Sequence, residues 1–282
     1  MRCLQIGLGL GLLGIVVAAM PAQASCGIDQ CPLPGETRAP APWQVATKSR
    51  LTIVADDAWY GEGFLSLQRQ LGLGVAGGLI LPWVHNAQGQ TSVSGLGNIV
   101  AYTEWQSRPV GAEEAQGLHR RFGLQVELPT AQDDALGDGH YLFMPYGGLS
   151  WLRGLWDLRG TLALGQTLGG GHHHHHHHHG HEGHEEPHGG DSLAAVNPHS
   201  ATELLLRGSV GYRVRSGAVL WRGGLGLDVV QELVDGQQTL AQGQLELQAQ
   251  GPRLGFTLGA DVPVTSARRW QGRGRIGLQL SF

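Results

Sequence analysis

The sequence predicts an all-β protein: a closed antiparallel transmembrane β-barrel of about twelve strands that carries a long histidine-rich extracellular loop. Three observations lead to this prediction. Apolar and polar residues alternate in many strand-length segments, the N-terminus has the pattern of a secretory signal, and the chain ends on an aromatic residue. Only 15% of residues are charged, 46 are glycine, and no long apolar segment follows the signal, so this chain would have to cross a membrane with strands.

The clearest alternation lies at the C-terminus. Ile276, Leu278, Leu280 and Phe282 fall on one face of an extended chain, and the residues between them are glycine or polar. A period of two indicates a strand with one apolar and one polar face. A last strand of this kind that ends in phenylalanine resembles the assembly signal of bacterial outer-membrane barrels, so we expect Phe282 to engage the barrel-assembly machinery.

The same pattern recurs along the chain. The predicted strands span roughly 49–60, 62–70, 75–84, 97–106, 116–128, 139–152, 155–167, 201–214, 217–231, 238–250, 252–264 and 272–282. An even number of strands leaves both chain ends on the periplasmic side. The longest connections, 85–96, 129–138 and 168–200, then all face outward, and most of the periplasmic turns are very short, which is the asymmetry typical of such barrels.

Charged residues fall mainly on the face opposite the apolar one and are expected to line the lumen. Facing lipid near the membrane centre, an arginine would cost about 2–4 kcal/mol. The predicted lumen residues are Arg121, Glu127, Asp157, Arg159, Arg207, Arg213, Arg222, Asp228 and Arg275. A soluble β-sandwich also has strands with one apolar face, but the regular Arg, Gln and Glu on the other face count against it.

Residues 1–24 are predicted to be a cleaved signal peptide. Arg2 precedes an apolar run at 8–20, and Ala22-Gln23-Ala24 is a small-x-small cleavage site. The run is too short to span a membrane comfortably. We therefore expect export through the inner membrane and residence in the bacterial outer membrane, in contact with its lipid. An alternative is a lipoprotein acylated at Cys26.

Two cysteines remain after cleavage, Cys26 and Cys31. An oxidising compartment favours a small disulfide loop. A thiolate metal site is the other interpretation, and it would need further ligands to complete a tetrahedral shell. Several prolines follow, so residues 25–48 are expected to form an extended periplasmic segment before a barrel at 49–282.

Several short motifs resemble a known family. They are Leu81-Pro82-Trp83, Gly95-Leu-Gly-Asn98, Gly123-Leu-Gln-Val-Glu-Leu-Pro-Thr130, Leu136-Gly-Asp-Gly139 and Pro145-Tyr-Gly-Gly148. Their order is similar to that in the outer-membrane transporter family named after the phenol meta-pathway degradation genes, from about residue 50 to the end. Asn98 stands where that family has Asp, and Ala131 where it has Gly. These are turn and strand-end features, so the resemblance implies the barrel and no particular substrate.

Most of the histidines gather in one predicted loop, 168–200. The predicted metal ligands are His172, His173, His174, His175, His176, His177, His178, His179, His181, His184 and His188, with Glu182, Glu185 and Glu186 between them. Imidazole suits Zn²⁺, Cu, Ni and Co. Because nothing preorganises one geometry, we expect loose binding at several sites, with Zn²⁺ as the first candidate. An engineered tag and a neutral repeat expansion in a tolerant loop are the alternatives.

These features predict a channel-like or transporter-like barrel with a metal-capturing loop, acting in metal uptake, efflux or buffering. Two alternatives stay open: a non-conducting surface metal-binding barrel, and a barrel that passes small organic solutes with an incidental loop. No Gly-x-Ser-x-Gly, His-Glu-x-x-His or phosphate-loop motif is present, so an enzyme is not expected. The net charge of −4 gives no nucleic-acid footprint.

Overall fold

The computed structural model describes residues 42–55, 58–107, 116–137, 139–169, 200–234, 238–267 and 269–282. These residues form thirteen strands: β1 (Trp43–Ala55), β2 (Ala58–Gly72), β3 (Val75–Gln88), β4 (Thr91–Leu96), β5 (Ile99–Gln106), β6 (Gly117–Leu128), β7 (Tyr141–Arg153), β8 (Trp156–Leu168), β9 (Thr202–Ser216), β10 (Val219–Glu232), β11 (Thr239–Gln250), β12 (Leu254–Pro263) and β13 (Gly272–Ser281). No helix in this described part is long and apolar enough to cross a membrane.

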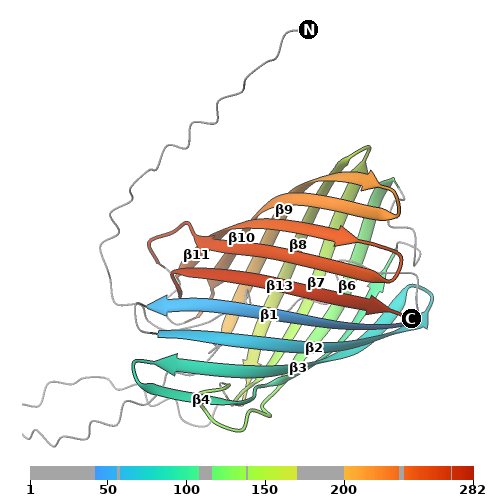
Figure 1. Ribbon diagram of the computed structural model, residues 1–282. Coiled ribbons are helices and arrows are strands. Elements are labelled where there is room, and N and C mark those ends of the chain that lie inside the picture. Colours follow the sequence, from blue (N-terminus) through green and yellow to red (C-terminus); the bar gives the residue numbers. More distant parts are fainter. Residues whose placement is uncertain are drawn as a thin grey trace, which may run out of the picture.

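Twelve of the strands close into an antiparallel barrel (Figure 1). Each pairs with its neighbours around the ring, β3 pairs with β5, and β1 pairs with β13 from Gln44↔Ser281 to Ile53↔Gly272. Trp43 and Phe282 exchange backbone hydrogen bonds of 3.2 Å in both directions. Strands that are the first and last in sequence thus lie side by side, which confirms the predicted fold class and the twelve-stranded closure.

The thirteenth strand, β4, was not predicted. The expected loop at 85–96 is instead the tip of a hairpin in which β3 continues to Gln88, turns at Gly89 with φ +56°, and pairs with β4. The residues at this tip are mostly polar or small on both faces, so they carry no alternating apolar signal. The hairpin forms without that signal, through backbone pairing from Trp83↔Leu96 to Gln88↔Thr91.

The predicted first strand was also misplaced. It was expected at 49–60, but β1 covers Trp43–Ala55 and the turn lies before Ala58. The break expected at residue 61 is absent, because Gly61 and Gly63 sit inside β2, where they pair with β1 and β3. Residues 43–48, assigned to the periplasmic segment, therefore belong to the wall; Thr47 and Lys48 blur the alternation there.

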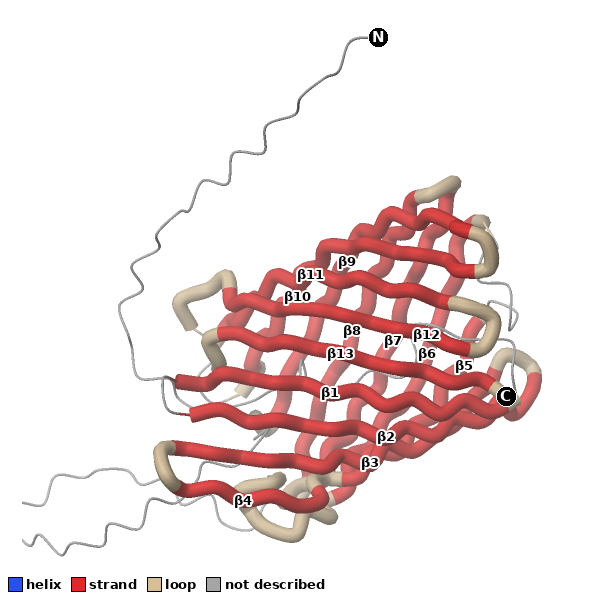
Figure 2. Tube along the Cα trace, in the orientation of Figure 1, coloured by secondary structure: helices blue, strands red, loops and turns tan. Residues whose placement is uncertain are grey.

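The barrel has two distinct ends, and the loops and turns lie at these ends (Figure 2). The terminal end is the one that holds Trp43 and Phe282, and it has short turns such as those after Arg153 and Ser216, where Gly154 and Gly217 each have φ +59°. A positive φ suits glycine because it has no Cβ. The opposite end, called the loop end, holds the connections from β6 to β7, β8 to β9, β10 to β11 and β12 to β13.

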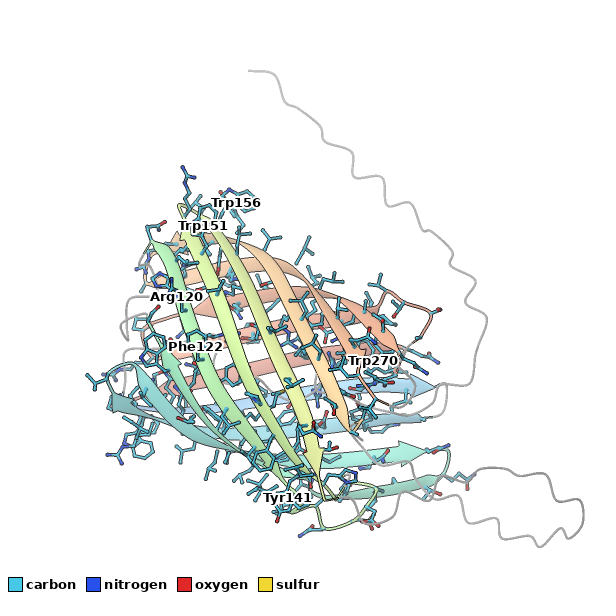
Figure 3. All side chains as sticks on the ribbon, turned by 180° about the vertical axis from the view of Figure 1, so that it is seen from behind. Arg120, Phe122, Tyr141, Trp151, Trp156 and Trp270 are labelled. Atoms are coloured by element: carbon cyan, nitrogen blue, oxygen red, sulfur yellow. The ribbon has the colours of Figure 1, made fainter. Side chains whose placement is uncertain are left out.

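The outer surface is apolar. Large hydrophobic side chains at alternate strand positions are exposed, among them Leu225 at 62%, Leu245 at 60% and Leu258 at 48%. Aromatic residues mark both ends of this surface. Those at the terminal end are Trp43, Trp105, Trp151, Trp156, Tyr212 and Trp221, and those towards the loop end are Trp59, Trp83, Tyr141 and Phe143. Figure 3 shows Trp151 and Trp156 at one end and Tyr141 at the other. Two aromatic girdles around an apolar band are typical of outer-membrane barrels.

Candidate functional site

The interior of the barrel is lined by charged and amide side chains that bond across strands. One network centres on Arg222 of β10. Its Nε donates to Asp157 Oδ2 at 3.0 Å, and its Nη1 donates to Glu246 Oε1 at 2.8 Å. Arg159, two residues from Asp157 on β8, donates to the same carboxylate at 2.7 Å. Ion pairs therefore connect β8, β10 and β11 across the inner wall.

A second network surrounds Asp228, whose side chain is fully buried. Arg207 forms a bidentate pair with its carboxylate, with Nε 2.8 Å from Oδ1 and Nη2 2.6 Å from Oδ2. Gln242 and Gln244 donate to Oδ2 at 3.1 and 2.8 Å. A buried charge needs this degree of pairing, because removal from water is otherwise very costly.

Three further ion pairs extend the polar lining to the seam of the barrel. Asp261 of β12 accepts hydrogen bonds from Arg273 Nε at 2.6 Å and Arg275 Nη2 at 2.7 Å, both on β13. Arg50 and Glu62 lie directly opposite each other on β1 and β2 and form a buried bidentate ion pair. Charges of both signs are thus distributed around the ring.

The wall formed by β5, β6 and β7 is polar as well, but less dense in arginine. Tyr146 Oη donates to Glu104 Oε2 at 2.8 Å, and Gln106 donates to Glu104 Oε1 at 2.6 Å. Arg121 Nη2 donates to Thr161 Oγ1 at 2.6 Å. This side of the interior therefore combines charged, phenolic and amide groups.

All nine residues that the sequence assigned to the lumen alternate with the exposed apolar positions of their strands, and each is buried or half-buried. They are Arg121, Glu127, Asp157, Arg159, Arg207, Arg213, Arg222, Asp228 and Arg275. The predicted lumen set left out several other inward charges: Arg50, Glu62, Glu104, Glu203, Glu232, Glu246, Asp261, Arg269 and Arg273. The alternation had put Glu104, Glu246 and Asp261 on the polar face of their strands. Most stand at alternating positions and could have been found in the same way. Arg269 could not, because it lies between strands.

The interior also has an apolar layer towards the loop end. Its buried members are Leu142, Met144, Tyr146, Ala163, Leu205, Val230 and Leu240, and Ala267 packs against them. Beside it is a cavity of about 20 Å³ whose lining includes Asp228, Leu240 and Trp270. This volume holds about one water molecule.

Several of the family-like motifs meet at one corner of the loop end. Asn98 Nδ2 donates to Glu127 Oε1 at 2.9 Å, while its Oδ1 accepts from Ala131 N at 3.2 Å. Leu136 packs in a buried cluster with Val84 and Tyr60. A Cβ added at Gly137 would lie 2.7 Å from Asn98 Oδ1, so this glycine permits the close approach. The motifs therefore fix how the connection from β6 to β7 folds against β3.

The predicted metal ligands lie outside the described residues. This applies to the histidines and glutamates of 172–188 and to Cys26 and Cys31. In the described part of the chain, no three His, Cys, Asp or Glu side chains are grouped so that they could hold a metal ion. Isolated histidines there have ordinary contacts; His85, for example, bonds to Ser94 Oγ at 2.6 Å.

Solved structures share the architecture. The crystal structure of the COG4313 outer membrane channel from Pseudomonas putida F1 matches with a TM-score of 0.60 and 10% identity, over 89% of this chain and 100% of that one. The KdgM porin matches with a TM-score of 0.50 and 10% identity, over 85% and 99%. No protein-family model and no curated protein matches the chain. Identities this low show the fold alone.

The fold is therefore that of an outer-membrane β-barrel. The closed ring, the exposed apolar band and its aromatic girdles support an outer-membrane location. The finer resemblance, to the phenol meta-pathway family, remains a prediction from the sequence motifs.

Proposed function

We propose that this chain forms an outer-membrane channel for small solutes and captures transition-metal ions on the connection between β8 and β9. The observation that supports the channel is the polar interior, in which arginine–carboxylate networks line the wall from β8 around to β2. A barrel that only anchored a surface loop could fill its interior with apolar side chains. Paired charges of both signs suit the passage of small polar solutes, because they offer many hydrogen-bonding partners at little net charge.

The channel proposal predicts solute flux. Purified protein in liposomes should cause swelling in isotonic solutions of small neutral sugars, because water and sugar would pass through the polar interior. The swelling rate should scale with the amount of inserted protein and fall as the sugar grows. Liposomes that carry heat-unfolded protein are the control. Folded protein that admits neither sugars nor ions would favour the alternative of a non-conducting metal-binding barrel.

The metal proposal rests on the histidines and glutamates of residues 172–188. The strands that flank this connection end at Leu168 and begin at Thr202, at the loop end. With the termini in the periplasm, as in bacterial barrels, that end faces outside the cell. Capture of Zn²⁺, or of Cu, Ni or Co, would concentrate the ion beside the mouth of the channel.

Deleting residues 172–188 should abolish most of the Zn²⁺ stoichiometry and leave the barrel folded, since barrel stability comes from the strands. Imidazole has an ordinary pKa of about 6.5 and binds metal only when neutral, so affinity should be present at pH 7.5 and collapse at pH 5.5. Calorimetric titration of both proteins at both pH values measures this. Equal stoichiometry at pH 7.5 would show that the metal binds elsewhere.

A further inference from the structure

The connection between β12 and β13 contacts strands other than the two that it joins. At its start, Val264 N and Thr265 N bond to Ala241 O of β11, and at its end Gln271 N bonds to Ile53 O of β1 at 2.7 Å. Between these points Arg269 reaches Glu203 of β9 and Glu232 of β10. Since β9 lies three strands from β12 in the ring, the connection leans over the interior at the loop end.

The contact of Arg269 with the wall is buried and charged. Its Nη2 donates to Glu203 Oε1 at 2.6 Å and to Glu232 Oε1 at 2.7 Å, and all three side chains are less than 9% exposed. Glu203 and Glu232 are direct cross-strand partners. Two carboxylates in that position repel each other, so the guanidinium between them removes a repulsion as well as adding two charge-assisted bonds.

Neighbouring residues hold the same connection against the inner wall. Ala267 packs on the apolar layer that includes Leu205 and Val230. Trp270 is 3% exposed and stacks on Arg273, whose guanidinium carbon lies 4.8 Å from the ring centroid. Figure 3 labels Trp270. The described residues of this connection, 264–267 and 269–271, therefore occupy interior space that a simple turn would leave open.

A second connection narrows the same end from the other side. Residues 129–137, between β6 and β7, place Leu136 against Tyr60 and Val84, and Asn86 Nδ2 donates to Ala135 O at 2.9 Å. These wall residues belong to β2 and β3, which lie across the ring from β9 and β10. Two inward-folded connections thus face each other at the loop end.

We propose that the connection from β12 to β13 sets the upper size limit for solutes, and that Arg269 is the residue that holds it in place through Glu203 and Glu232. This rests on the proposed channel function. The opposing connection at 129–137 is held by short-range hydrogen bonds and apolar packing, whereas the middle of the β12–β13 connection is tied to the far wall, β9 and β10, through the Arg269 guanidinium. Without the Arg269 guanidinium, the β12–β13 connection can move away from β9 and β10, and the opening of the channel at the loop end becomes wider.

The test compares Arg269→Gln with wild type in planar bilayers and in liposome swelling with neutral mono-, di- and trisaccharides. We expect at least a twofold rise in single-channel conductance and entry of sugars that wild type excludes. Neutral sugars report size, because a change in the charge of the lumen alone would alter ion selectivity and leave sugar entry unchanged. The matched control is Arg253→Gln, at an exposed turn of the terminal end, which should match wild type.

A triple variant, Arg269→Gln with Glu203→Gln and Glu232→Gln, removes the carboxylate repulsion if the single variant assembles poorly, and should show the same larger cutoff. Folded variants with the sugar cutoff of wild type would overturn the inference while leaving the channel proposal intact. A wild type that is closed and an Arg269→Gln variant that conducts would support it. If no variant conducts, the channel proposal fails and this inference fails with it.

Discussion

Replacing Asp228 by alanine should lower the free energy of unfolding by about 3–5 kcal/mol, the range observed when one partner of a buried ion pair is removed. Asp228 is fully buried and accepts from Arg207, Gln242 and Gln244. Without this carboxylate, the guanidinium of Arg207, which is 14% exposed as a side chain, keeps its charge in the interior and loses the bidentate partner that balances it.

Two further variants distinguish the effect of losing the ion pair with Arg207 from the effect of losing the volume of the Asp228 side chain. Asp228→Asn keeps the shape and a hydrogen-bond acceptor but removes the charge, so it should fall between wild type and Asp228→Ala. Asp228→Leu together with Arg207→Met removes both charges and should cost less than Asp228→Ala, because no charge is stranded. Denaturant unfolding in detergent micelles, followed by tryptophan fluorescence, measures all three. An Asp228→Ala variant within about 1 kcal/mol of wild type would contradict this account of the network.

The sequence predicts the barrel well because every strand of a membrane barrel alternates apolar residues that face lipid with polar or small residues that face inward. In β13, Ile276 and Leu278 are exposed and Arg275 and Gly277 face inward, as the alternation indicates. Register errors would reverse both faces, so the pattern carries much information. It weakens where neither face meets lipid, which is why the hairpin of β3 and β4 was missed.

The functional details of the loop end are harder to predict from the sequence. Arg269 lies in a connection, where no periodicity applies, and its two partners come from 66 and 37 residues earlier in the chain. Only the closed ring brings these residues together. Glu203 and Glu232 do alternate with exposed neighbours, but their shared cation could be found only in three dimensions. The same holds for the corner that joins Asn98 to Glu127 and Ala131.

This chain is a membrane barrel with lipid outside and a polar interior, and β12 offers a matched pair of positions at which to test that arrangement. Leu258 is 48% exposed and lies between Leu247 and Ile276 on the neighbouring strands. Thr257, the adjacent residue, is half-buried and faces inward, where it pairs with Gly277, and the flexible side chain of Lys48 lies over that glycine. The two positions share one strand and one depth and differ only in face.

The most direct measurement is therefore the folding of Leu258→Arg and Thr257→Arg into lipid vesicles, followed by denaturant unfolding. A guanidinium on the lipid face near the membrane centre costs about 2–4 kcal/mol, whereas one in the polar interior can be solvated. We expect Leu258→Arg to lose about this much stability, or to fail to insert, while Thr257→Arg inserts and stays within about 1 kcal/mol of wild type. Equal losses in the two variants, or a larger loss for Thr257→Arg, would contradict the placement of lipid and lumen and with it the proposed channel.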